Sequence, residues 1–198
     1  MLDSRAMPTP RILAFDGSLR GASWNRLLLR PAMDGARRAG AQVDQLLLRE
    51  HPMPLLDEDL EREQGMPEAA ARFKAALVAH DGFLIACPEY NSSITAPLKN
   101  AIDWASRAAP GEKPLAAFSG KVVALMSTSP GNFGGLRGLV TVRSILGNIG
   151  VLVLPDQVAV PRAAEAFDAD GRLKDDKQRA ALEALGARLA DVAGRLAG

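Results

Sequence analysis

Residues 15–25 read Phe-Asp-Gly-Ser-Leu-Arg-Gly-Ala-Ser-Trp-Asn, a loop that follows a short apolar run and precedes a helix-forming one. Its glycines allow tight turns and a close approach of the backbone to a ligand. Its serine, asparagine and arginine side chains can donate hydrogen bonds, and the start of the next helix favours an anion. The stretch indicates a phosphate site, although an ordinary strand-to-helix turn has the same general form. The candidate binding residues are Gly17, Ser18, Arg20, Ser23 and Asn25.

Apolar strand-like runs alternate with helical runs five times along the chain. Such alternation predicts a five-stranded parallel sheet with helices on both faces. The expected strands cover 11–15, 42–48, 83–87, 121–126 and 151–154, with a resumption of the last at 157–160 left open. The run Leu46-Leu47-Leu48 indicates that the second strand is buried on both faces.

The helical runs lie between these strands and after the last one. The expected helices cover 25–39, 68–80, 95–107 and 136–147, and a final one ends the chain. Pro31 predicts a kink in the first helix, and Thr95 is expected to cap the third. We expect 51–60 to be a loop and 61–67 to be mobile.

Polar loops follow the first, third and fourth expected strands, at 15–25, 88–97 and 127–135. In the strand order 2-1-3-4-5 these three strands are neighbours, so their loops meet at one edge of the sheet. Ligands of such sheets bind at that edge, where the winding reverses. The sequence therefore predicts one pocket built from three loops.

The composition fits one globular domain covering 1–198, with 47% hydrophobic and 24% charged residues. The net charge of +1 and the lack of basic runs give no indication of nucleic-acid or membrane partners. Cys87 is the single cysteine, and the first residues do not resemble a signal peptide, so we expect a cytoplasmic protein. The two histidines have no partners at ligand spacing, so we expect no metal site.

The first loop lacks both Gly-x-Gly-x-x-Gly and Gly-Lys-Ser/Thr, and it has no lysine to hold a triphosphate, which favours a monophosphate. Residues 17–25 resemble the Gly-Ser-x-Arg-x-x-Ser-x-Asn loop of the NADPH-dependent FMN reductase family, which has quinone, chromate and azo reductase relatives. Two further stretches are similar to other signatures of that family. They are Pro88-Glu-Tyr-Asn91 with Leu98-Lys-Asn-Ala-Ile-Asp-Trp104, and Ser127-Thr-Ser-Pro-Gly131 with Gly134, Gly135 and Arg137.

The resemblance implies a flavodoxin-like three-layer sandwich that binds FMN and uses NADPH or NADH to reduce a small-molecule acceptor. The flavin would carry the redox chemistry, so no catalytic side chain is expected. The first loop would hold the FMN phosphate, and Pro52–Leu55 would border the entrance for nicotinamide and acceptor. The flavin ring and ribityl chain would lie against Pro88, Glu89, Tyr90, Asn91, Ser92, Ser127, Gly131, Gly134 and Gly135.

The resemblance also implies a homodimer or homotetramer, and the apolar residues of 98–104 suggest a contact with another subunit. Asp16, Ser92 and Ala96 depart from the family pattern. A carboxylate facing a phosphate would repel it, so we expect the Asp16 side chain to turn away or to bond to loop amides. Two other functions remain open: a flavodoxin-like electron carrier, and a non-redox binder of a phosphorylated metabolite.

Overall fold

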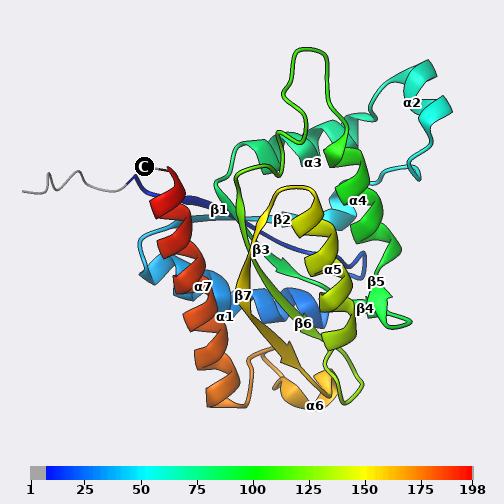
Figure 1. Ribbon diagram of the computed structural model, residues 1–198. Helices are drawn as coiled ribbons and strands as arrows, with labels where there is room; N and C mark the ends of the chain where they lie inside the picture. Colours follow the sequence, from blue (N-terminus) through cyan, green and yellow to red (C-terminus); the bar gives the residue numbers. More distant parts are fainter. Residues whose placement is uncertain (1–7, 198) are drawn as a thin grey trace, which may run out of the picture.

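A computed structural model describes residues 8–197 and shows a twisted parallel sheet between two layers of helices (Figure 1). The strand order is β2-β1-β3-β6-β7, which confirms the predicted order 2-1-3-4-5 because β6 and β7 are the fourth and fifth strands of this sheet. The strands are β1 (Arg11–Asp16), β2 (Gln42–Leu47), β3 (Gly82–Ala86), β6 (Val122–Thr128) and β7 (Leu152–Val160).

Helices α1 and α7 cover one face of the sheet, and α3, α4 and α5 cover the other (Figure 1). The helices are α1 (Trp24–Arg38), α2 (Glu58–Gln64), α3 (Glu68–Val78), α4 (Ala96–Ser106), α5 (Leu136–Asn148), α6 (Ala163–Ala166) and α7 (Asp176–Ala197). A short 3-10 helix covers Leu48–Glu50. None of the helices in the described part of the chain is long and apolar enough to cross a bilayer.

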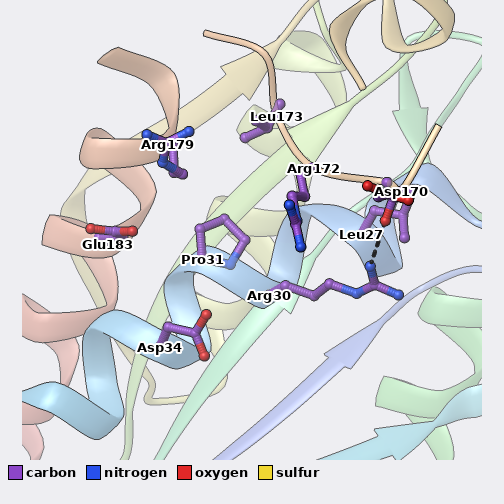
Figure 2. Close-up of a pocket in the computed structure, with 10 residues that line it drawn as sticks. Leu27, Arg30, Pro31, Asp34, Asp170, Arg172, Leu173, Arg179 and Glu183 are labelled. Atoms are coloured by element: carbon purple, nitrogen blue, oxygen red, sulfur yellow. Dashed lines mark hydrogen bonds between the residues drawn. The ribbon is translucent and has the colours of Figure 1, made fainter. Parts of the chain in front are cut away.

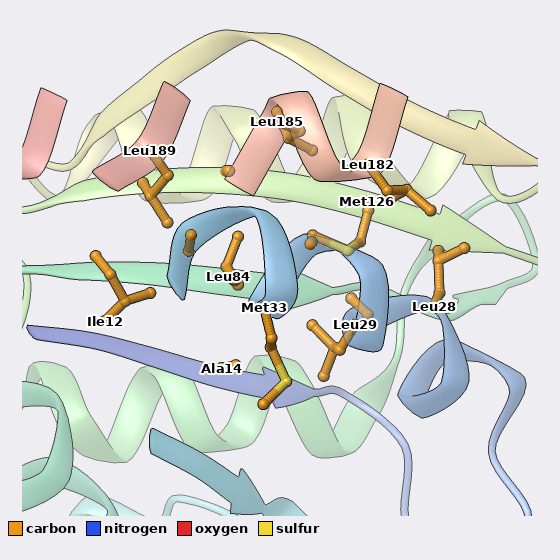
Figure 3. Packing of buried hydrophobic residues seen from close by; sticks show 14 of the residues in the cluster. Ile12, Ala14, Leu28, Leu29, Met33, Leu84, Met126, Leu182, Leu185 and Leu189 are labelled. Atoms are coloured by element: carbon orange, nitrogen blue, oxygen red, sulfur yellow. The ribbon is translucent and has the colours of Figure 1, made fainter. Parts of the chain in front are cut away.

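The core beneath α1 and α7 consists mainly of leucine and alanine side chains, with Met33 and Met126 among them, packed on the sheet (Figure 3). The two helices approach each other closely at glycines. A Cβ atom added to Gly186 would lie 1.9 Å from the carbonyl oxygen of Ala32, and one added to Gly35 would lie 2.0 Å from that of Glu183. No side chain fits at either position, so these glycines set the distance between the helices.

The prediction that the second strand is buried on both faces is wrong. β2 is an edge strand that pairs only with β1, and none of its residues is fully buried. The apolar run continues past the strand, where Leu48 turns into the core from the 3-10 helix. The run of three leucines therefore marks the end of a strand.

The prediction of a loop over 51–60 and a mobile segment over 61–67 is also wrong in part, because α2 forms there. Asp57 caps this helix by accepting a hydrogen bond from the Asp59 N–H at 2.9 Å. The acidic first turn suits the positive end of the helix dipole, and Gly65 ends the helix with a φ of 75°.

Candidate functional site

The polar loops after β1, β3 and β6 meet at the carboxyl edge of the sheet, as the strand order requires. Between them lies a pocket of about 90 Å³. All three loops contribute to its lining, which consists of Ser18, Arg20, Ser23, Trp24, Asn25, Pro88, Glu89, Tyr90, Thr128, Ser129 and Pro130. This volume is well below the ~300–1,000 Å³ of a pocket that encloses a whole small ligand. The pocket therefore suits one small polar end of a ligand.

The β1–α1 loop (residues 17–23) is fixed at its start by backbone contacts. The Gly17 N–H donates to the carbonyl oxygen of Ala86 at 2.9 Å, and the Thr95 hydroxyl donates to the Gly17 carbonyl oxygen at 2.8 Å. A Cβ atom at Gly17 would lie 2.8 Å from the Leu98 side chain, so the close packing on α4 requires glycine. Thr95 also caps α4, which confirms that prediction.

Most peptide N–H groups of this loop have no acceptor within residues 8–197. The unpaired donors belong to Ser18, Leu19, Gly21, Ala22 and Ser23, and to the first two residues of α1, Trp24 and Asn25. Unpaired N–H groups beside a helix start form a ready site for an anion. The donor set therefore fits the phosphate of FMN.

Two loop side chains complete this donor set. The Ser23 hydroxyl accepts from the Arg26 N–H at 3.3 Å and so caps α1, and the Ser18 hydroxyl accepts from the Arg20 N–H at 3.1 Å. The Ser18 hydroxyl keeps its own hydrogen for another acceptor, whereas the Ser23 hydroxyl also faces the Asp16 carboxyl and lowers its pKa. The Arg20 guanidinium lies over the Trp24 ring, 5.4 Å from its centroid, at the rim of the pocket.

Asn25 lines the pocket, and its amide also joins two loops. It donates to the Thr128 carbonyl oxygen at 2.9 Å and accepts from the Thr128 N–H at 3.0 Å. This pair of bonds connects the start of α1 to the end of β6. The nitrogen and the oxygen of the Asn25 amide therefore both take part in hydrogen bonds within the protein.

The loop after β3 forms a tight hairpin of β4 (Glu89–Tyr90) and β5 (Ser93–Ile94). Asn91 and Ser92 connect these strands with φ values of 50° and 66°, as in a type I′ turn. The Glu89 carboxylate accepts from the Gly138 N–H at 2.8 Å and pairs with Arg137 at 3.2 Å. Glu89 thus holds the hairpin against α5 and has no geometry of a catalytic base.

The loop after β6 is supported from below by Ser127. The buried Ser127 hydroxyl donates to the Cys87 carbonyl oxygen at 2.6 Å. Gly135 has a φ of 85°, and a Cβ atom there would lie 1.9 Å from the Ser127 oxygen. Burial raises the pKa of the Cys87 thiol, so this cysteine is a core residue without thiolate reactivity.

The structure divides the predicted site residues into two groups. Those that line the pocket are Ser18, Arg20, Ser23, Asn25, Pro88, Glu89 and Tyr90. Those that lie in the surrounding loops without lining it are Gly17, Asn91, Ser92, Ser127, Gly131, Gly134 and Gly135. The sequence analysis missed Trp24, Thr128, Ser129 and Pro130, although the quoted stretches contained all four.

Asp16 lies directly beneath the β1–α1 loop with its side chain fully buried. Burial raises the pKa of this carboxyl, and the Ser23 hydroxyl and the Arg26 guanidinium act in the opposite direction. The expectation that its side chain turns away from the phosphate site is consistent with this position, because Asp16 is not among the residues that line the pocket.

A second pocket of about 310 Å³ lies on the other side of Leu19. Most of its lining is apolar and comes from Leu48, His51, Pro52, Met53, Leu55, Ala96, Pro97 and Ala101. Asn100 and Trp104 both donate to the Pro54 carbonyl oxygen, at 2.9 and 2.8 Å, and hold this wall in place. Trp104 is fully buried by this contact, so it cannot contribute to the predicted subunit contact.

A larger pocket, about 640 Å³, lies away from the three loops, between α1 and the segment that leads into α7 (Figure 2). Its side chains are charged and mostly exposed, and several pair with each other or with neighbours. Glu183 pairs with Arg38, Asp34 with Arg37, and Arg179 with Asp176. This cleft has none of the unpaired backbone donors of the β1–α1 loop, and we do not assign the cofactor to it.

The fold and the three loops define a class of flavodoxin-like α/β protein with a polar pocket at the carboxyl edge of its parallel sheet. Residues 10–165 match the family of NADPH-dependent FMN reductases, and the chain belongs to this family.

Curated relatives agree with this assignment. The chain is 41% identical to an NAD(P)H-dependent FMN reductase of Pseudomonas aeruginosa, over 85% of this chain and 87% of the relative. It is 34% identical to an NAD(P)H:quinone oxidoreductase of Solanum tuberosum, over 98% of this chain and 97% of the relative.

Solved structures agree as well. The flavoenzyme FerB of Paracoccus denitrificans, an NAD(P)H:acceptor oxidoreductase, superimposes with a TM-score of 0.78 at 28% identity, covering 94% of this chain and 98% of FerB. An archaeal flavodoxin superimposes with a TM-score of 0.62 at 10% identity, covering 92% of this chain and 98% of its own, and this match concerns the fold alone. The chain is therefore an FMN-dependent NAD(P)H oxidoreductase, which decides between the three functions left open by the sequence.

Proposed function

We propose that the β1–α1 loop holds the phosphate of FMN and that the flavin ring lies against the hairpin at 88–92 and the loop at 127–135. The observation that carries this proposal is the set of seven unpaired N–H groups in and after the β1–α1 loop. Bound FMN supplies the hydride chemistry between NADPH or NADH and an acceptor. The protein would supply binding and orientation, and the two further loops would contact the ring because they meet the first loop at the same pocket.

We propose quinones and free flavins as the class of acceptor. Two relatives are named for these substrates, and the 310 Å³ pocket beside Leu19 has the apolar lining that a quinone needs. Pro52, Met53 and Leu55 belong to this lining, as the sequence analysis expected for the acceptor entrance. We also propose that the protein acts in the cytoplasm. The whole chain would form one FMN-binding domain.

We propose that the protein works as a homodimer through one face of α5. Phe133, Leu136 and Val140 expose 61%, 41% and 64% of their surface there. Leu136 and Val140 are four residues apart and share one side of the helix. Large apolar side chains gathered on one face favour a partner surface.

The test of cofactor and activity uses the purified full-length protein. We expect it to bind FMN with a change in the visible flavin spectrum, and NADPH or NADH to bleach that spectrum without oxygen. A quinone should then restore the colour faster than an azo dye or chromate, and with excess NADPH or NADH a catalytic amount of the protein should bleach added free FMN. Lack of FMN binding, or bound FMN that neither nicotinamide bleaches, would contradict the proposal.

A further inference from the structure

Asp16 is the residue beneath the phosphate site that the sequence analysis could not explain. It ends β1, its side chain is fully buried, and its Oδ2 atom has no hydrogen-bond partner within residues 8–197. A buried carboxylate without full pairing is costly, so its position needs a compensating contact. The nearest cation is Arg26, in the first turns of α1.

The Arg26 guanidinium connects Asp16 to the middle of the β1–α1 loop. Its Nε atom lies 3.4 Å from Asp16 Oδ1. Its Nη1 atom donates to the Gly21 carbonyl oxygen at 2.9 Å, and its Nη2 atom donates to the Arg20 carbonyl oxygen at 3.0 Å. One planar fork therefore binds three acceptors, which a lysine ammonium on a flexible stem would not hold in the same geometry.

These contacts decide where the loop presents its donors. In a trans peptide the C=O bond and the next N–H bond point in opposite directions. Because Arg26 holds the carbonyl groups of Arg20 and Gly21, the N–H groups of Gly21 and Ala22 point away from it. Both of these N–H groups are among the unpaired donors of the loop.

The charges around the loop agree with this arrangement. Arg20 lies at the pocket rim, and the Arg49 guanidinium lies so close to Gly21 that an added Cβ atom would be 2.8 Å from its Nη1. Asp16 is the acidic residue beneath the loop, and Arg26 stands between it and the loop carbonyls. A phosphate would meet N–H donors and cations instead of carbonyl oxygens and a carboxylate.

We propose that Arg26 is the positioning residue of the phosphate loop, that Asp16 is its anchor, and that the pair makes the site selective for a flavin that carries a phosphate. This inference rests on the proposed FMN function. It predicts that the pair affects the affinity for FMN much more than the affinity for riboflavin, which is the same flavin without the phosphate.

The test measures the dissociation constants of FMN and riboflavin by flavin fluorescence on the full-length protein. Arg26→Lys keeps the positive charge but loses the planar guanidinium. We expect it to raise the dissociation constant of FMN about tenfold or more. Riboflavin should change by less than about threefold, because it makes no phosphate contact. Arg30→Lys is the matched control one turn further along α1, since within residues 8–197 the Arg30 side chain bonds to the Asp170 carbonyl oxygen alone, and it should leave both constants unchanged.

Two variants of Asp16 keep the test decisive if Arg26→Lys does not fold. Asp16→Asn retains an acceptor for Arg26 and should bind FMN at least as tightly as the wild type. Asp16→Ala removes the anchor and should weaken FMN about tenfold, again with little effect on riboflavin. If a variant lost affinity for FMN and for riboflavin by the same factor, the pair would only support folding. If Asp16→Asn and Asp16→Ala bound FMN with equal affinity, Asp16 would be excluded as the anchor. A wild type that prefers FMN over riboflavin, with every Arg26 and Asp16 variant keeping the wild-type affinities, would overturn this inference alone. A wild type that binds both flavins equally would also overturn the proposed phosphate site, and one that binds neither would overturn the proposed FMN binding itself.

Discussion

Ser23 combines two tasks in one small side chain, because it caps α1 and lines the phosphate pocket. Ser23→Asn and Ser23→Asp both preserve a capping oxygen and have nearly the same shape. Only the aspartate adds a negative charge where a phosphate is expected to bind. We therefore expect Ser23→Asp to bind FMN at least about tenfold more weakly than Ser23→Asn, as measured by fluorescence titration. Equal affinities of the two variants would show that the phosphate binds elsewhere, and similar melting temperatures would confirm that both caps function.

At the scale of whole elements, the contact between α1 and α7 depends on two glycines that leave no room for a side chain. We expect Gly186→Ala to lower the free energy of unfolding by about 1–3 kcal/mol, because its Cβ atom would collide with the Ala32 backbone and push the helices apart. Gly147→Ala is the matched control in α5, where an added Cβ atom meets nothing within 4 Å. It should raise stability by up to about 1 kcal/mol through helix propensity. Urea denaturation measures both, and a neutral Gly186→Ala would mean that the helices can separate at little cost.

At the scale of the whole molecule, the exposed face of α5 predicts the oligomeric state. Light scattering of the wild type should give about twice the chain mass of 21.0 kDa. Val140→Glu replaces the most exposed of these apolar side chains by a charge and should shift the protein toward 21.0 kDa. Val78→Glu, on the exposed end of α3, is the control and should leave the mass unchanged. A monomeric wild type would contradict the dimer, and a dimer that tolerates Val140→Glu would place its interface on another surface.

The sequence predicted most of the fold because its signals are local. Alternating apolar runs gave the five strands, and Thr95 was identified as a cap from its position before a helical run. Burial of the second strand was predicted wrongly, since an edge position depends on which strands pair and not on the residues of the strand itself. α2 was missed because the prolines before it outweighed the capping signal of Asp57.

For the site, the sequence indicated which loops form the pocket. It did not indicate which of their residues line the pocket and which support the loops from below. Ser127, which the resemblance placed beside the ring, supports the loop from below through a bond to the Cys87 carbonyl oxygen, and the sequence did not indicate that bond. Arg26 was not among the predicted site residues, because an arginine in the first turns of a helix is common on protein surfaces. Its contacts to two loop carbonyl groups exist only in the folded chain and leave no pattern of spacing. Such contacts depend on the conformation of the loop and cannot be read from one sequence, although the residues lie close together in the chain.

The double hydrogen bond between Asn25 and Thr128 has a consequence for how tightly and how quickly the cofactor binds. It joins two segments that lie 103 residues apart in the chain, without any contribution from a ligand. Because both bonds are made between protein groups, they favour a pocket whose two walls keep their relative position when a flavin binds, which would reduce the conformational entropy lost on binding. Association would then be limited by diffusion and orientation, and the proposed phosphate contacts would lengthen the lifetime of the complex.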